Sequence, residues 1–273
     1  MLGCPENRGF FMKHARLTLI LLSLLLALTA WQGLVMLRDY PNFILPSPLQ
    51  VGTRFVEAIR DGSLLRHTAI TLLEVLSGLA LGVGGATVLG YLLARSLPLE
   101  RLLSPYIVAS QAIPIVAIAP LLVIWFGPGM FSKVLICALI VFFPVLINTV
   151  VGVRSVPSDL RDLLRSLRAT RWQTLRLLET PAALPVFLGG LRVGATLAVI
   201  GAVVGEFVGA KSGLGFLINV GRGLYDTALV FVAVFTLVAL ALSLYGLVAW
   251  LESRLLTWQR LPENEMGQHY DTI

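Results

Sequence analysis

One long polar segment, Val156–Pro185, carries the side chains of this chain that are best suited to bind another molecule. Arginines recur along it, at Arg161, Arg165, Arg168, Arg171 and Arg176. Leucines recur between them, at Leu160, Leu163, Leu164, Leu167, Leu175 and Leu178. Spacings of three and four residues place the leucines on one face of a helix. The arginines then lie on the flanks of that face.

The first half of this polar segment has the signals of a short helix. Ser158 is the predicted N-cap, and Asp159 and Asp162 in the first turn suit the positive end of the helix dipole. A bend is expected near Arg168–Thr170.

A second helix is predicted after that bend. Thr170 and Gln173 have the T-x-x-Q spacing of a capping box, which marks a helix start. Pro181 and Pro185 are expected to end the helix. The polar segment therefore reads as a helix–turn–helix lying at a membrane surface.

Catalytic and cofactor motifs do not appear in the sequence. Residues 205–212 (GEFVGAKS) have three residues between the glycines and an alanine before the lysine, so they do not form a phosphate-binding loop. The three histidines (His14, His67 and His269) are far apart, and two cysteines, Cys4 and Cys137, support neither a disulfide framework nor a metal site. We expect no cofactor, no metal and no enzyme activity in this chain.

The remaining sequence is typical of an all-α integral membrane protein. It is 57% hydrophobic and 13% charged, with a mean hydropathy of +0.86. About 20 apolar residues span a bilayer. Six predicted spans cover residues 17–36, 69–95, 105–126, 132–152, 186–210 and 228–250.

The distribution of basic residues predicts the orientation. With the N-terminus inside, 14 Lys and Arg residues fall on the cytoplasmic side and 7 on the other. The positive-inside rule then places both termini and the polar segment in the cytoplasm. Basic cytoplasmic loops account for the isoelectric point of about 9.7, so no nucleic-acid partner is expected.

These features define the predicted domains. Residues 1–16 form a cytoplasmic arm and 17–36 the first span; a cleaved signal peptide is the alternative, but the run is long and lacks an A-x-A site. Residues 37–68 form an external segment with an amphipathic helix over Val51–Arg66. Residues 69–258 form the core domain, which includes the polar segment, and 259–273 form a cytoplasmic tail.

Small residues recur every fourth position in two of the spans. Gly78, Gly82, Ala86 and Gly90 form one ridge, and Gly201, Gly205 and Gly209 form another. Such ridges let helices approach closely in lipid. They are interpreted either as packing within one subunit or as a dimer seam or moving gate.

Prolines and amides within the third and fourth spans indicate a pathway. Pro114, Pro120 and Pro144 remove backbone hydrogen bonds, and kinked helices line many transport pathways. Gln111, Pro114 and Asn148 are therefore pathway candidates, and Glu206 of the fifth span is a fourth.

Three ionisable residues lie at membrane depth, where charge is costly. Glu74 is expected to be hydrated or paired with Arg66. Glu206 is expected to accept hydrogen bonds from nearby backbone, with a role in the pathway as the alternative. Arg192 is expected to extend to the cytoplasmic face.

The polar segment resembles the cytoplasmic loop of ABC importer permeases, E-A-A-x-x-x-G followed after nine residues by I-x-L-P. The matching positions are Asp162-Leu163-Leu164, then Arg168, then Leu178-Glu179-Thr180-Pro181. Asp replaces Glu, leucines replace the alanines, Arg168 replaces the glycine, and Thr180 replaces a leucine. A non-glycine residue at position 168 is strained if its φ is positive.

Further motifs resemble permeases of the nitrate, sulfonate and taurine class over residues 45–258. They are Leu45-Pro46-Ser47-Pro48, Ala112-Ile113-Pro114, Ala119-Pro120-Leu121, Trp125-Phe126-Gly127, Phe143-Pro144, Asn148-Thr149, Val204-Gly205-Glu206 and Gly213-Leu214-Gly215-Phe216. The resemblance implies a type I ABC importer (MetI-like) permease fold in the bacterial inner membrane. It implies two permease copies, two ATPase subunits that hold ATP and Mg²⁺, and a periplasmic or lipid-anchored solute-binding protein.

The resemblance also implies which residues couple transport to the ATPase. The predicted coupling residues are Asp162, Leu163, Leu164, Arg165, Leu167, Arg168 and Thr170. The implied cargo is a small polar solute, such as nitrate, a sulfonate, taurine, or a pyrimidine or vitamin precursor. The alternative function is a stand-alone secondary transporter or channel, but this alternative gives the basic polar segment no role. A third possibility, a membrane enzyme, is not supported, because the sequence has no set of catalytic residues.

Overall fold

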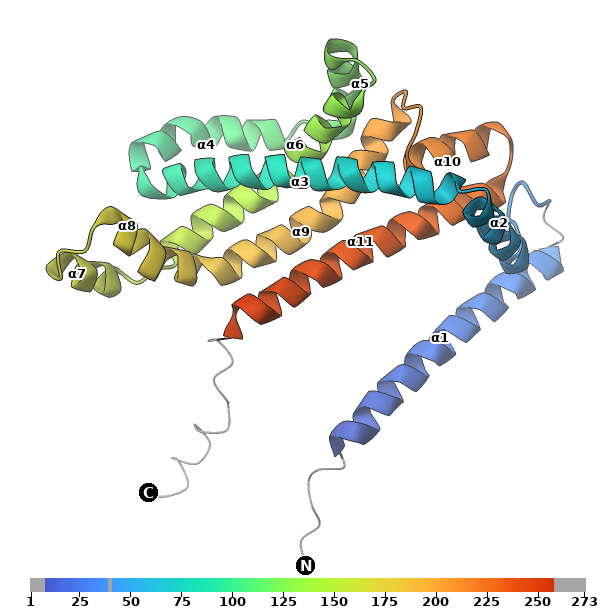
Figure 1. Cartoon of the computed structure of the whole chain (residues 1–273), viewed down its shortest axis with the longest axis horizontal. Helices are drawn as coiled ribbons and strands as arrows, with labels where there is room; N and C mark the ends of the chain where they lie inside the picture. Colours follow the sequence, from blue (N-terminus) through green and yellow to red (C-terminus); the bar gives the residue numbers. More distant parts are fainter. Residues whose placement is uncertain (1–7, 39–40, 258–273) are drawn as a thin grey trace, which may run out of the picture. The chain divides into compact units, whose positions relative to one another are not determined.

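The computed structural model describes residues 8–38 and 41–257, except for the side chains of residues 8–17 and 20. Every regular element in these ranges is helical (Figure 1). The elements are α1 (Arg8–Arg38), α2 (Pro48–Arg60), α3 (Ser63–Arg95), α4 (Leu97–Gln111), α5 (Ile115–Phe126), α6 (Met130–Arg154), α7 (Ser158–Ser166), α8 (Arg171–Thr174), a π-helix η2 (Leu175–Glu179), α9 (Thr180–Phe207), α10 (Leu214–Gly223) and α11 (Thr227–Leu255). The all-α prediction is confirmed. Cys4, His269 and the tail 259–273 lie outside the described residues.

Five described helices are long and apolar enough to cross a membrane: α1, α3, α6, the continuous run Arg171–Phe207, and α11. Helices α4 and α5 meet at 94°, and they make a sixth crossing if the two are counted together as one bent span. The predicted third span is therefore broken rather than merely kinked. Pro114 lies at the break because it has no N–H and disfavours helical geometry in the residue before it.

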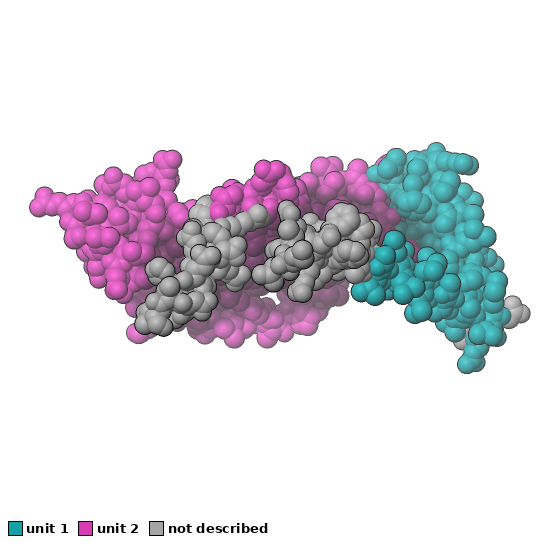
Figure 2. Space-filling model, turned by 90° about the horizontal axis from the view of Figure 1, so that it is seen from below, with its two compact units in different colours: residues 1–65, 217–234 teal, residues 66–216, 235–273 magenta. Residues whose placement is uncertain are grey.

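The chain forms two compact units, coloured separately in Figure 2. The smaller unit comprises residues 1–65 and 217–234, and the larger unit comprises residues 66–216 and 235–273. Helices α3, α10 and α11 contribute residues to both units.

In the smaller unit, a capping box starts α2. Ser47 and Gln50 each bind the backbone N–H of the other with their side chains, and Pro48 occupies the first turn. The helix ends at Arg60, since Gly62 adopts a φ of +75° and a new helix begins at Ser63. The predicted amphipathic helix over 51–66 is thus shorter than expected.

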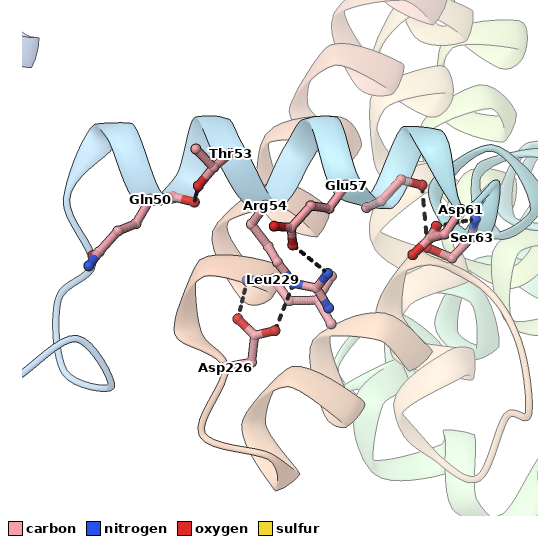
Figure 3. A network of polar contacts seen from close by, with 9 residues as sticks. Gln50, Thr53, Arg54, Glu57, Asp61, Ser63, Asp226 and Leu229 are labelled. Atoms are coloured by element: carbon pink, nitrogen blue, oxygen red, sulfur yellow. Dashed lines mark hydrogen bonds and ion pairs between the residues drawn. The ribbon is translucent and has the colours of Figure 1, made fainter.

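A polar network joins α2 to the start of α11 within the same unit (Figure 3). Arg54 Nε lies 2.8 Å from Asp226 Oδ2, and Arg54 Nη1 lies 3.3 Å from Glu57 Oε2. Asp226 Oδ1 accepts a 3.0 Å hydrogen bond from the Leu229 amide, so this carboxylate also caps α11. One acid therefore positions two helices.

In the larger unit, the glycine ridge of α3 lies against α6. Cβ atoms added at Gly78, Gly82 and Gly90 would meet Cys137, Ala138 and Thr149, respectively. Close backbone approach of this kind supports packing within one subunit.

Helix α9 packs on the same helix in a similar way. Gly201 faces Cys137, and Gly205 faces the side-chain stem of Lys133. Gly209 does not continue this ridge, because it lies beyond the end of α9 with a φ of +106° and no neighbour within 4 Å of an added Cβ. The helix ends at Phe207, before the ridge could reach a third member.

Candidate functional site

The polar segment folds as α7, a tight turn, α8 and η2, and then continues into α9. Pro157, with a ψ of 137°, occupies the N-cap of α7, and Ser158 is already in the first turn. The predicted N-cap at Ser158 is therefore wrong by one residue. Proline suits this boundary because it needs no backbone donor and cannot follow a helical residue easily.

Arg168 forms the bend that the sequence predicts. Its φ is +54°, and α7 ends in a Schellman arrangement: the Ala169 amide donates to Leu164 O and the Arg168 amide donates to Arg165 O, both at 3.0 Å. Glycine adopts this left-handed geometry without strain, whereas arginine does so at a cost of about 1–2 kcal/mol. The turn shape that the motif needs is thus kept without its usual residue.

The second helix begins at the predicted capping box. The Thr170 amide donates to Gln173 Oε1 at 2.7 Å, and the Gln173 amide donates to Thr170 Oγ1 at 3.3 Å. Pro181 and Pro185 do not end the helix, contrary to the prediction. Pro181 lies in the first turn of α9, where its missing N–H is tolerated, and Pro185 removes only one interior hydrogen bond.

A buried carboxylate, Glu179, anchors the polar segment to the end of α3. Its side chain is 1% exposed, and its Oε2 atom lies 2.8 Å from Arg95 Nη2 and 3.4 Å from the Tyr91 hydroxyl. Arg161 Nε of α7 lies 3.8 Å from Oε1. Sequence reasoning missed Glu179, although it is an acid among five arginines and its motif position was noted.

The leucine face of α7 is left open to solvent in this chain. Leu160, Leu163 and Leu167 are between 45% and 68% exposed, whereas Leu164 is half-buried. Asp162 and Arg165 form an exposed pair at 3.1 Å, one turn apart on the same helix. Exposed leucines beside charged groups have the composition of a partner-binding helix face.

A basic cavity of about 700 Å³ opens beside these helices. It is lined by four arginines, Arg95, Arg161, Arg165 and Arg171, together with Tyr91, Ala169, Thr174 and Glu179. The lining therefore carries a net positive charge.

The predicted pathway residues have different neighbours and do not form one cluster. Gln111 ends α4 and Pro114 caps α5, on either side of the break. Asn148 of α6 donates to the carbonyl of Pro144 at 2.8 Å and lies against Gly190 of α9. Glu206 lies in a separate buried network, described next.

Glu206 accepts hydrogen bonds at both of its oxygens. The Thr71 hydroxyl donates to Oε1 at 2.6 Å, and the Gly215 amide donates to Oε2. A Cβ at Gly213 would collide with the carboxylate, and the φ of +113° there also favours glycine; a Cβ at Gly215 would lie 2.8 Å from Glu206 Oε2. The prediction that Glu206 accepts hydrogen bonds from nearby backbone is confirmed.

The sequence predicts that Glu74 is hydrated or paired with Arg66. Both alternatives are wrong, because Glu74 is buried and has a different partner. It is 1% exposed, and its Oε1 atom lies 2.6 Å from Lys133 Nζ of α6. Burial in the larger unit favours an internal partner over an external one, because a lone buried charge is strongly disfavoured. Lys133 was missed as a partner, although it is a cation near the start of the long apolar helix α6.

The third ionisable residue, Arg192, is also paired inside the larger unit. Its guanidinium contacts Glu252 of α11 and lies 5.0 Å from the ring centre of Tyr245. The sequence did not indicate either of these two partners. That Arg192 extends to the cytoplasmic face stays a prediction.

Residues 86–257 match the family described as "Binding-protein-dependent transport system inner membrane component". The chain is 52% identical to the riboflavin transport system permease protein of Chloroflexus aurantiacus, over 87% of this chain and 88% of that protein. It is 37% identical to the formylaminopyrimidine transport permease of Halalkalibacterium halodurans (80% and 87%) and 33% identical to the taurine transport system permease of Escherichia coli (89% and 90%).

Solved structures show the same fold. A methionine ABC transporter, MetNI, in an inward-facing conformation matches with a TM-score of 0.63 at 19% identity, covering 72% of this chain and 97% of that one. An amino acid ABC transporter matches with a TM-score of 0.59 at 19% identity, covering 73% and 98%. The MetI-like fold prediction is confirmed.

The chain belongs to the binding-protein-dependent inner membrane transport family. It is a permease subunit of an ABC importer, a membrane component that works with an ATPase and a binding protein. This assignment decides between the two sequence interpretations in favour of the importer subunit over a stand-alone transporter or channel.

Proposed function

We propose that this permease moves a vitamin or vitamin precursor with a flat heteroaromatic ring, such as riboflavin or a pyrimidine. The observation that carries this proposal is the 52% identity to a riboflavin permease over almost the whole chain. Relatives named for sulfonates and taurine share only 33–34%. Among the solutes expected from sequence, the heteroaromatic group is therefore favoured.

Uptake in proteoliposomes tests this cargo. Vesicles containing the permease, its ATPase and its binding protein are expected to accumulate labelled riboflavin or formylaminopyrimidine when ATP is supplied on the ATPase side. Unlabelled taurine is expected not to compete. Accumulation of taurine in place of both heteroaromatic compounds would overturn the proposal.

Coupling to the ATPase is assigned to α7 and the turn after it. The exposed leucines of α7 supply an apolar contact, and Asp162, Arg165, Arg168 and Thr170 flank it. Glu179 ties the same segment to α3, so a displacement of α7 is transmitted to a spanning helix. Closure of the ATPase on ATP would move α7 as part of a rigid body.

Leu163→Asp tests this coupling role without burying a charge, since Leu163 is 54% exposed. The variant is expected to lose ATPase co-purification and transport while keeping its thermal stability. Leu177→Asp is the matched control, because Leu177 is 66% exposed on η2 and outside the predicted coupling set. Normal transport by the Leu163 variant would refute the docking role; Leu164→Asp is a less clean test because Leu164 is half-buried.

The same proposal includes two permease copies, an ATP and Mg²⁺ site on the ATPase alone, and cytoplasmic termini. The positive charge of the polar segment supports this orientation. A cysteine placed at Arg165, in a variant lacking Cys4 and Cys137, is expected to react with a membrane-impermeant maleimide only from the cytoplasmic side. Labelling from the external medium alone would reverse the topology.

A further inference from the structure

Two cavities of the larger unit adjoin each other at the inner ends of the spanning helices. The basic cavity measures about 700 Å³, and a second, of about 410 Å³, shares Tyr91 and Glu179 with it. Both lie within the range of about 300–1,000 Å³ that is common for small-molecule sites. Their shared residues make one site with two chemically different halves.

The basic half suits a phosphate group. Four guanidinium groups and one carboxylate line it, and one of the four, Arg165, is paired with Asp162 at 3.1 Å, so these groups together keep a net charge of two positive. Arg95 and Arg161 are turned toward Glu179, whereas Arg165 and Arg171 extend the basic surface beyond it. Arginine binds phosphate oxygens with two parallel hydrogen bonds, so it is the residue best suited to hold such a head group.

The second half is apolar. Its walls come from α3, α6, η2 and the start of α9, and include Val88, Leu92, Val153, Leu175, Leu184 and Phe187. A slot with these apolar walls offers no favourable contacts to a free inorganic anion. It can bind a hydrocarbon chain, because it excludes water around it.

The position of the paired cavities fits the polar–apolar boundary of a bilayer. Arg95 is the last residue of the spanning helix α3, and Glu179 lies within the spanning run 171–207, close to its start. Basic pockets between spanning helices at the cytoplasmic side bind anionic lipid head groups. We propose that this site binds one anionic phospholipid, with its phosphate among the arginines and an acyl chain in the apolar slot.

The proposal is tested on the purified permease–ATPase complex in a neutral detergent. Phosphatidylglycerol and phosphatidylcholine with the same acyl chains are titrated in turn, and bound lipid is counted by native mass spectrometry. Inorganic phosphate is added separately as a competitor. The complex is expected to retain phosphatidylglycerol in preference to phosphatidylcholine.

Two variants address the two halves of the site. Arg171→Gln is expected to weaken phosphatidylglycerol binding about tenfold, the loss that one charge-assisted hydrogen bond represents. Leu184→Trp fills the slot and is expected to weaken it by a similar factor. The matched controls are Arg176→Gln and Leu177→Trp, because both residues are exposed and line neither cavity; both are expected to bind as the unmodified protein does.

Three results would overturn the proposal. Equal retention of the two lipids would show that the arginines do not select the head group. Full competition by inorganic phosphate together with unchanged binding by Leu184→Trp would assign the basic cavity to a free anion. Binding by the isolated permease that disappears in the complex would mean that an acidic segment of the ATPase occupies the site.

Discussion

Lys133 Nζ lies 2.6 Å from Glu74 Oε1, and both side chains are at most 6% exposed. The pair joins α6 to α3 in the larger unit, at a position where neither residue reaches water. A second carboxylate, Glu206, is buried in the network of Thr71 and the Gly213–Gly215 backbone. This part of the helix bundle is therefore held by charge as well as by close packing.

Breaking this buried pair is expected to destabilise the protein strongly. Lys133→Met leaves the Glu74 carboxylate without its cation, and removing one partner of a buried ion pair costs about 3–5 kcal/mol. Thermal unfolding in detergent measures the effect. The double variant Glu74→Gln with Lys133→Met is expected to recover most of the loss, and equal unfolding temperatures for the single and double variants would contradict a pairing role.

Replacing Arg168 by glycine is expected to stabilise the turn after α7. The left-handed φ of +54° costs a non-glycine residue about 1–2 kcal/mol, and the greater unfolded-chain entropy of glycine offsets part of this gain. We expect a net gain of about 0.5–1 kcal/mol in unfolding free energy. Tyr225→Gly, with a φ of +56°, is the parallel case; a loss of stability in both variants would show that these turns are not strained.

The close contact of α3 with α6 is tested by two neighbouring glycines. A Cβ at Gly82 would lie 2.6 Å from Ala138 O, whereas among the described residues no atom of another helix lies within 4 Å of one at Gly84. Gly82→Ala is expected to lower the unfolding free energy by about 1–3 kcal/mol. Gly84→Ala is expected to raise it slightly, because alanine favours helix by about 0.8–1.0 kcal/mol. Identical melting temperatures would argue against the tight interface.

Glu179→Gln is expected to loosen the polar segment while leaving the rest of the bundle folded. The neutral amide loses its charge attraction to Arg95 and Arg161, which hold α7 against α3. Faster amide hydrogen exchange over residues 158–178 and transport that lags behind ATP hydrolysis are the expected readouts. Glu57→Gln is the control, since Glu57 is 64% exposed, lies outside the coupling set, and forms an (i, i+3) pair with Arg54 of a kind worth about 0–1 kcal/mol.

Features of the polar segment that depend on neighbouring residues could be predicted from sequence. The capping box of Thr170 and Gln173 forms as expected, because both partners lie within one turn. The bend at Arg168 was anticipated from the motif spacing, whereas the chemistry of proline predicted a kink in the third span, which is broken at Pro114. Local rules failed at Ser158, where Pro157 takes the N-cap.

Contacts between distant residues could not be predicted in this way. Glu74 was expected to be hydrated or paired with Arg66, eight residues earlier, because no sequence pattern brings Lys133 beside it. Glu179 was quoted only as part of a motif, and its contacts with Arg95 and Arg161 arise from the packing of three helices. The leucines of α7 could be recognised from spacing, since their exposure follows from one helix alone.

Helices α6 and α9 contact each other through backbone atoms at two points along their length. An added Cβ at Gly152 would lie 2.9 Å from Ala183 O, and one at Gly201 would lie 2.8 Å from the Cα atom of Cys137. Main chain resting on main chain cannot be taken up by a change of rotamer, so the two helices have little slack between them. A displacement of the Arg154 end of α6 should therefore be transmitted to its Lys133 end with little loss, as in a stiff lever.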